Sequence, residues 1–484
     1  MPDKPHTILV LGGGPAGLTT AWKLALAGKR VTVLEADDQV GGLSKTVRRN
    51  GYAFDLGGHR FITHNMALAE DVQNLLGDRL SVRPRISTIR LMDKFFKYPL
   101  DFGDLVKKLP VLTQMHCGFD YLITAISRRL KEYPDESLRD WVINRFGRTL
   151  YNIYFGPYSE KLWGIAPSEI SADWAAQRIS LPNLWDVFLR LLGKKSDQPK
   201  TYATRFFYPV GGIGVISERL VEEIHEADSA NKVLLNARVK GFIHAGNKIQ
   251  KVVYEHNGIQ KDISADFIVS TIPLPHLIHT MEPELEQDLL KVSGKMIFRS
   301  LRFLNVMLDM EQVSENTWMY IPEHKYYFFR IQEPKNWHPG NAPEGKTSLI
   351  LEIACNYGDE KWTASDDDTA EKCFKSLHDL GWDIRAKAFG WFSTFARFSY
   401  PIYTLDYKKT LRTAFRILNR FKNLVSCGRQ GLYRYNNMDH SMEMGILAAR
   451  HILEGIPRED IYRVATEGES FEQENRQAYT SDNA

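Results

Sequence analysis

The chain has 484 residues, 43% hydrophobic and 25% charged, which is enough for two or three domains with cores of their own. Its formal net charge of +3 is too small to indicate nucleic-acid binding. No apolar run is long enough to predict a membrane span, and the 4 scattered cysteines show neither metal-ligand spacing nor a C-x-x-C pair. We therefore expect free thiols and a cytoplasmic location.

The N-terminal stretch predicts a dinucleotide-binding unit. A short apolar strand ending at Leu11 leads into a G-x-G-x-x-G turn, an amphipathic helix and a second strand that ends in an acid. The glycines permit a tight turn, close approach of a pyrophosphate and close packing of helix on strand, and the helix N-terminus favours the diphosphate. The terminal acid can accept hydrogen bonds from ribose. Predicted contacts are Gly12, Gly14, Pro15, Ala16, Gly17 and Glu35. This motif alone leaves FAD and NAD both open.

A second glycine signal follows at Gly41-Gly42-Leu43 and in Phe54-Asp-Leu-Gly57-Gly58-His59. Glycines at these points suggest a backbone that lies against a large planar cofactor. The arrangement resembles the glutathione-reductase type of FAD fold, so the expected cofactor becomes FAD. His59, beside the expected flavin, is then a candidate functional histidine rather than an ordinary turn residue.

The rest of the chain divides into segments of different pattern. Residues 66–204 are predicted to be mostly helical, with a small hairpin near Arg90–Tyr98, and they carry many aromatic residues. Residues 291–419 read as an antiparallel sheet, with strands expected at 301–308, 318–321, 326–331 and 348–353. Residues 1–65, 205–290 and 420–457 are predicted to form a discontinuous FAD-binding domain that includes Val239. Residues 458–484 are expected to form a polar, partly mobile tail. The expected class is α/β, a Rossmann-type domain with a helical and an antiparallel-sheet substrate domain.

The last glycine turn begins at Gly428 and precedes a helix that starts near Asp439, His440 and Ser441. In this fold type such a helix directs its N-terminus at the flavin and stabilises negative charge there.

Taken together, the motifs resemble those of the UDP-galactopyranose mutases, and the resemblance extends over nearly the whole chain. The matching segments, in order, are residues 41–46, 54–59, Tyr98-Pro99, Pro157-Tyr158 with Trp163, Arg178, Pro209-Val-Gly-Gly212, Tyr320-Ile-Pro322, Phe329-Arg330, Tyr400-Pro401, Gly428-Arg429 and Arg434-Tyr435 to His440.

The resemblance implies particular roles. Arg178 and Arg330 correspond to two arginines that clamp the substrate diphosphate, which suits two planar, always-charged donors. Trp163 and Asn437 lie beside the sugar and His59 beside flavin N5. The remaining substrate-binding residues are Tyr98, Tyr158, Tyr320, Tyr400, Arg429 and Tyr435. Each tyrosine has an alternative role in core packing.

The resemblance also implies a reaction without net redox. In such a reaction flavin N5 of reduced FAD would displace the nucleoside diphosphate from the anomeric carbon and form an N5-glycosyl adduct. The sugar would open as an iminium and reclose through a different hydroxyl, and the diphosphate would return to the anomeric carbon and release the flavin. The physiological reductant, for which NAD(P)H is one candidate, and the oligomeric state both stay open. Some residues depart from the family pattern and leave the base and the sugar open: Asp101, Ser159, Trp337 and a shorter segment between Tyr435 and His440.

Two other interpretations remain at this point. One is an FAD-dependent oxidoreductase of the protoporphyrinogen oxidase and amine oxidase type, in which we would expect an apolar slot rather than arginines. The other is a non-catalytic flavin-binding protein, for which loss of His59 or of an arginine would have been the signal.

Overall fold

The computed structural model describes residues 7–98, 102–131, 133–178 and 205–465. A five-stranded parallel sheet carries the N-terminal motif, in the order β20-β13-β1-β2-β9. Its strands are β1 (Thr7–Leu11), β2 (Arg30–Leu34), β9 (Lys232–Leu234), β13 (Phe267–Ser270) and β20 (Leu424–Ser426). The three segments expected to share one domain thus do contribute strands to one sheet.

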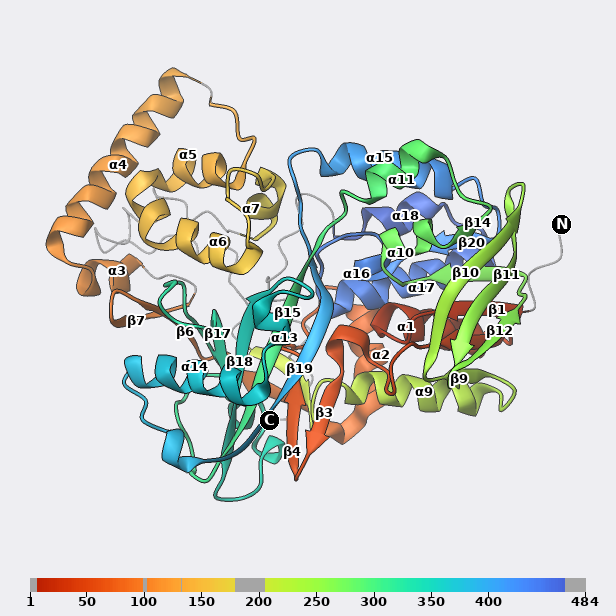
Figure 1. Cartoon of the computed structure of the whole chain (residues 1–484), viewed down its shortest axis with the longest axis horizontal. Coiled ribbons are helices and arrows are strands. Elements are labelled where there is room, and N and C mark those ends of the chain that lie inside the picture. Colours follow the sequence, from red (N-terminus) through yellow and green to blue (C-terminus); the bar gives the residue numbers. More distant parts are fainter. Residues whose placement is uncertain (1–6, 99–101, 132, 179–204, 466–484) are drawn as a thin grey trace.

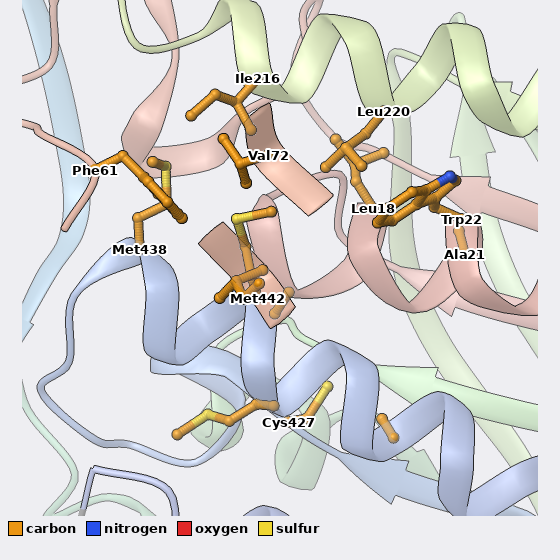
Figure 2. Close-up of a cluster of buried hydrophobic side chains, with 14 of the residues drawn as sticks. Leu18, Ala21, Trp22, Phe61, Val72, Ile216, Leu220, Cys427, Met438 and Met442 are labelled. Atoms are coloured by element: carbon orange, nitrogen blue, oxygen red, sulfur yellow. The ribbon is translucent and has the colours of Figure 1, made fainter. Parts of the chain in front are cut away.

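Alternation within β1 explains why both faces of this sheet are buried. Ile8 and Val10 belong to one hydrophobic cluster, and Leu9 and Leu11 to another. The first cluster includes helices α1 (Pro15–Leu26), α2 (Met66–Leu76), α9 (Val215–Ala227) and α17 (Met438–Glu454). Figure 2 shows part of it, with Leu18 and Trp22 of α1 near Leu220 of α9, and Met438 and Met442 of α17 on the other side.

The opposite face is covered by a second sheet and by helices. The sheet consists of β10 (Ala237–Ala245), β11 (Lys248–His256), β12 (Ile259–Ile263) and β14 (Met281–Glu282). The helices are α10 (Leu274–His279), α11 (Gln287–Ser293) and α15 (Tyr407–Leu418). We expected α15 to belong with the antiparallel sheet of residues 291–419, but its Ala414 and Ile417 pack into this cluster instead.

The antiparallel sheet has seven strands, in the order β19-β15-β18-β17-β16-β6-β7. They are β6 (Ser87–Leu91), β7 (Lys94–Lys97), β15 (Phe298–Leu308), β16 (Trp318–Tyr320), β17 (Arg330–Gln332), β18 (Thr347–Cys355) and β19 (Ala388–Pro401). Helix α14 (Asp366–Asp379) packs on one face, and α12 (Pro334–Trp337) and α13 (Glu360–Thr363) lie in the connections. The expected strand at 326–331 is wrong over Tyr326–Phe329, because β17 begins only at Arg330.

The segment 66–204 is less helical than expected. The hairpin β6–β7 is confirmed, but it extends the antiparallel sheet through parallel pairing of β6 with β16. Another strand, β5 (Leu80–Pro84), pairs with β8 (Arg205–Pro209). The described helices are α3 (Phe102–Lys108), α4 (Val111–Leu130), α5 (Leu138–Leu150), α6 (Gly156–Trp163) and α7 (Ala172–Arg178), which form a separate lobe in Figure 1. Short strands whose partners lie far along the chain are not visible in local periodicity.

The tail also differs from the expectation up to residue 465. Helix α18 (Arg458–Arg463) buries Ile461, and Val464 and Ala465 join the core around α1 and α17. Arg434 donates a hydrogen bond to the carbonyl of Val464 over 2.9 Å. Residues 466–484 lie outside the described part. Within the described ranges, no helix combines the length and the apolar character that crossing a membrane requires.

The β-hairpin of β3 (Thr46–Arg49) and β4 (Tyr52–Asp55) holds the second glycine motif in place. Asp55 is fully buried and accepts hydrogen bonds from Thr46 Oγ1 at 2.6 Å, Tyr208 Oη at 2.7 Å and the Ile213 amide at 3.2 Å. Burial raises the pKa of the Asp55 carboxyl to about 6, against the opposing effect of these hydrogen bonds. The aspartate in the Phe-Asp-x-Gly-Gly-His motif therefore joins the hairpin to β8 and the turn before α9.

Candidate active site

A cavity of about 990 Å³ runs from the first glycine loop to the antiparallel sheet. It brings together residues from the predicted FAD-binding segments and from the antiparallel-sheet segment, and none of its lining residues comes from 66–204. Those lining it are Gly12, Gly14, Pro15, Ala16, Glu35, Gly42, Leu43, Gly58, His59, Val239, Tyr320, Arg330, Tyr400, Gly428, Arg429, Tyr435, Asn437 and Ser441. Its size is at the upper end for small-molecule and cofactor sites.

Two helix N-termini open onto this cavity. Helix α1 starts after Gly14 and α17 after Asn437, and neither has a side-chain cap, so their first amides are available to an anionic ligand. The two helices pack together closely: a Cβ atom on Gly445 of α17 would lie 2.5 Å from the carbonyl oxygen of Ala16 in α1. This contact holds both N-termini against one cavity.

The end of the cavity next to the first glycine loop fits FAD in the polar groups that it offers and in its size. Glu35 is buried, and its carboxylate accepts hydrogen bonds from the Gly13 amide at 2.6 Å and the Asp37 amide at 2.9 Å. Burial raises the pKa of the Glu35 carboxyl. Gly12 has a φ of +103°, and a Cβ there would overlap the Thr271 hydroxyl. One on Gly17 would overlap the Gly12 carbonyl, so Gly17 packs helix on strand rather than lining the cavity.

The two glycines before His59 have different surroundings. Gly58 lines the cavity, whereas Gly57 does not, and a Cβ on Gly57 would meet Phe303 at 3.2 Å and Glu352 at 3.6 Å. With a φ of +98°, Gly57 allows the turn to lie directly on the antiparallel sheet. Gly57 is thus not among the residues that line the cavity, and its contact with the cofactor stays a prediction.

His59 lines the cavity and lies near enough to Arg429 and Arg330 for their charges to act on it. Its Nδ1 atom is buried and has no hydrogen-bond partner among the described residues. Burial, followed by the positive charges of Arg429 and Arg330, lowers the pKa of the His59 imidazole to about 3. His59 is thus neutral at physiological pH and can hydrogen-bond a ligand without carrying charge.

This shifted pKa predicts a pH dependence of stability. The unfolded chain protonates His59 near 6.5 and the folded protein only near 3, so the unfolded state binds more protons between these values and stability falls as the pH falls below 6.5. At about pH 4.5 wild type should lose up to about 2 kcal/mol more, relative to pH 7, than a His59→Gln variant. Urea unfolding of both at the two pH values measures this. Equal losses would show that His59 is not held neutral.

Arg330 is held by an acid that the sequence analysis missed. Its Nε and Nη2 each donate to a carboxylate oxygen of Glu352 over 2.6 Å, and Gln332 also donates to Glu352. Glu352 is 0% exposed. Nη1 of Arg330 has no hydrogen-bond partner among the described residues, and Arg330 lines the cavity, so that nitrogen is available to a ligand. The available signal was one acid within the apolar strand Thr347–Cys355.

A second arginine, Arg429, lies in the wall of the cavity. Its guanidinium donates to the carbonyl of Ser399 and to that of Asn436, and it lies 4.2 Å from the ring centroid of Tyr435. Tyr435 stacks on Tyr400 at 5.4 Å and 17°. These contacts fix two phenol rings and one guanidinium at the cavity wall.

The other predicted aromatic residues form a layer behind the lining. Tyr98 and Tyr158 contact Tyr320, with ring centroids 4.7 and 5.8 Å apart, and Trp163 contacts Tyr400 at 5.7 Å. None of Tyr98, Tyr158 and Trp163 lines the cavity. Asp439 and His440 do not line it either, and they contact each other at 3.2 Å.

Two residues from the sequence analysis lie outside the described part of the structure. Arg178 is the last residue of α7, but its side chain is not described, and Asp101 is not described at all.

Lys161, which the sequence analysis also missed, joins α6 to the β16–β17 connection. Its ammonium donates to the carbonyls of Ile321, Glu323 and Phe328 at 2.7 to 3.0 Å. Burial lowers the pKa of Lys161 to about 7. These three hydrogen bonds hold the connection between Tyr320 and Arg330 in place. Lys161 therefore positions both of these cavity-lining residues.

Comparison with known proteins places this architecture in a family. The family model for flavin containing amine oxidoreductases matches residues 15–453. Coproporphyrinogen III oxidase from Propionibacterium freudenreichii subsp. freudenreichii is 27% identical over 186 residues, which are 36% of this chain and 34% of that protein. The chain thus matches only about a third of the length of that relative.

Solved structures of other proteins have the same fold over almost the whole length of this chain. A reduced UDP-galactopyranose mutase superposes with a TM-score of 0.82 at 22% identity, covering 96% of this chain and 99% of the other. Wild-type putrescine oxidase bound to putrescine gives 0.62 at 15% identity, with coverages of 93% and 99%. The flavin of the matched family suits the dinucleotide end of the cavity. The chain therefore belongs to the flavin-containing amine oxidoreductase family.

Proposed function

We propose that this protein is an FAD-dependent nucleotide-sugar mutase that interconverts pyranose and furanose forms of a sugar attached to a nucleoside diphosphate. The observation that carries the proposal is the polar, cationic end of the cavity, where Arg330 and Arg429 lie among Tyr320, Tyr400 and Tyr435. A pyrophosphate suits fixed guanidinium donors, whereas an oxidase for an apolar or aminated substrate needs an apolar slot or an aromatic cage.

Bound and reduced, FAD would supply the nucleophile for the anomeric carbon, with NAD(P)H as the proposed reductant. The chain's own contribution is to bind and to orient. Arg330 would hold the diphosphate through Nη1, since Glu352 fixes the plane of its guanidinium. A leaving group held in this way stays within reach of the opened sugar and can return to it.

The neighbouring side chains would assist by hydrogen bonding in their neutral forms. Neutral His59 lines the cavity, and its Nδ1, which has no hydrogen-bond partner among the described residues, would hydrogen-bond the flavin or the sugar. Burial raises the pKa of the Tyr400 phenol, so Tyr400 would stay protonated, and the hydroxyls of Tyr400 and Tyr435 would donate hydrogen bonds to substrate oxygens. Asn437 would contact the sugar from the N-terminus of α17. The residues proposed for substrate binding behind this lining are Tyr98, Tyr158 and Trp163. Arg178, whose side chain lies outside the described part of the structure, is proposed as the second arginine that holds the diphosphate.

The decisive experiment compares oxidised and reduced enzyme. The purified flavoprotein is incubated with a panel of UDP- and TDP-hexopyranoses, with and without dithionite, and products are separated by chromatography. We expect a furanose product with reduced enzyme alone and no net consumption of reductant. Bleaching of the oxidised flavin by a substrate, without added reductant, would instead establish an oxidoreductase, the class to which the sequence relative belongs. A protein that binds the sugars but forms neither product would be a binding protein.

A further inference from the structure

The cavity continues past the proposed sugar site to a group of aromatic residues that the proposed reaction does not use. Tyr357, Trp362 and Phe395 all line it, together with Arg397. We call these four residues the ring platform. Tyr357 is 57% exposed and Phe395 is 40% exposed, although burying these rings would stabilise the fold. Aromatic rings left open along the wall of a cavity are typical of a ligand site.

The three rings of the platform are tilted against one another and held in place. The ring centroids of Tyr357 and Trp362 are 5.2 Å apart with planes at 64°, and those of Trp362 and Phe395 are 4.8 Å apart with planes at 53°. Asp359 fixes the turn that carries the first two rings, because its carboxylate accepts hydrogen bonds from the amides of Asn356 at 2.7 Å and Trp362 at 2.9 Å. Side chains fixed before binding lose little conformational entropy when a ligand arrives.

The ring platform offers hydrogen-bond donors and a positive charge. Among the described residues the guanidinium of Arg397 has neither a hydrogen-bond partner nor an ion-pair partner, and it lies 3.8 Å from the ring centroid of Tyr357. The indole N–H of Trp362 also has no partner within the described ranges. The two acids of the turn are engaged, since Asp359 accepts from two amides and Glu360 pairs with a lysine at 2.9 Å. A carboxylate suits such a surface, because a guanidinium binds it with two parallel hydrogen bonds.

The strand order of the antiparallel sheet places the ring platform on the sugar side of the cavity. Tyr320 ends β16, and β17, β18 and β15 separate this strand from β19, so the cavity crosses about 19 Å of sheet. Arg330, the proposed diphosphate contact, begins β17. Trp163, proposed to lie beside the sugar, contacts Tyr400 of β19 at 5.7 Å. Because Arg397 precedes Tyr400 by three residues on β19, the platform lies beyond the sugar and away from the diphosphate.

We infer that the sugar of the nucleotide-linked substrate is a uronic acid, whose carboxylate binds Arg397 and whose carboxyl-bearing side contacts the three rings; this inference rests on the function proposed above. Two other ligands fit the platform less well. A flat nucleobase stacks face to face, which rings tilted by 53° and 64° do not offer as pairs. An ammonium group, which aromatic rings alone attract, is repelled by the guanidinium. The carboxylate of a uronic acid takes no part in closing either ring form, so it can stay bound throughout the interconversion.

Calorimetric titration of the oxidised flavoprotein tests the carboxylate site separately from turnover. The ligands are UDP, UDP-galactose and UDP-galacturonic acid, and the proteins are wild type, Arg397→Gln and Arg385→Gln. Arg385 is a matched control, because it also lies over two aromatic rings, those of Phe374 at 4.9 Å and Trp391 at 4.8 Å, but does not line the cavity. We expect wild type and Arg385→Gln to bind UDP-galacturonic acid about tenfold more tightly than UDP-galactose. Arg397→Gln should lose this preference and bind UDP as wild type does.

Turnover by the reduced enzyme gives a second measurement. We expect wild type to convert UDP-galacturonic acid with a higher kcat/KM than UDP-galactose. Arg397→Gln should raise KM for the acidic sugar and leave KM for UDP-galactose unchanged, because the guanidinium would contact only the carboxylate. Flavin content and the thermal midpoint establish that each variant is folded.

The outcomes separate the uronic acid site from the proposed reaction. If wild type and Arg397→Gln bind both nucleotide sugars with the same affinity, the inference is wrong, whereas the mutase proposal stands. An acidic preference that persists in Arg397→Gln, or that is lost equally in Arg385→Gln, would also overturn it. If the preference depends on Arg397 but the reduced enzyme forms no furanose from any sugar, the carboxylate site stands and the mutase proposal fails.

Discussion

Replacing Arg330 by alanine should destabilise the protein by about 3–5 kcal/mol and weaken the binding of a nucleoside diphosphate by more than tenfold. The stability loss follows because the substitution leaves the carboxylate of Glu352, which is 0% exposed, without the guanidinium that neutralises it. The affinity loss follows because Nη1 of Arg330 is the donor we propose for the diphosphate. Urea unfolding and calorimetric titration with UDP measure the two effects.

A double variant separates these two consequences. Arg330→Met with Glu352→Gln removes both charges and keeps similar volumes, so most of the lost stability should return. Binding of UDP should stay weak, since no guanidinium faces the cavity. If the double variant binds UDP as tightly as wild type, Arg330 does not hold the diphosphate. If the single variant is as stable as wild type, the ion pair with Glu352 is not the buried contact described above.

Replacing Gly445 by alanine should release the flavin. The added Cβ would lie 2.5 Å from the Ala16 carbonyl oxygen and 3.1 Å from Thr19 Cβ, so α17 must move away from α1. Overpacking of this kind costs about 1–3 kcal/mol. Because both helix N-termini open onto the cavity, the same movement should lower flavin affinity. Flavin absorbance per chain after gel filtration, together with the thermal midpoint, checks both effects.

Gly118→Ala is the matched control. Gly118 is also a helical glycine, but a Cβ there has nothing within 4 Å. Alanine should therefore stabilise α4 by about 0.5–1 kcal/mol and leave the flavin bound. Full flavin retention in Gly445→Ala would mean that the packing of α1 on α17 does not position the cofactor site.

Local features of the chain predicted much of the nucleotide-binding part. The apolar run ending at Leu11, the glycine turn and Glu35 indicated a strand, a loop and an acid after the second strand, and the structure has these elements there. That Glu35 binds the ribose stays a prediction. The glycine turn before α17 was equally visible, because a left-handed Gly428 and the helix after it are properties of neighbouring residues. Such features depend on backbone sterics and short-range periodicity, which a single sequence carries.

Family resemblance, rather than local pattern, indicated Arg330 and Arg429, and it did not indicate how they are held. Arg429 donates to two main-chain carbonyls in different segments, one of them 30 residues away. The roles of Glu352, Lys161 and Asp55 each depend on partners at least nine residues away, and in most cases far more. The hydrophobic periodicity of the sequence gives no indication of such pairings.

What the sequence by itself determined was therefore the cofactor class, the parallel sheet with its glycine turns, and the set of candidate residues. Only the tertiary structure decided which of them line the cavity and which, like Gly57, Tyr158 and Trp163, lie behind it. It also decided that the apolar face of α4 is exposed, although the same pattern would suit a core helix. The physical reason is that burial and ion pairing depend on which distant elements meet, and hydrophobic spacing along the chain specifies a face but not what covers it.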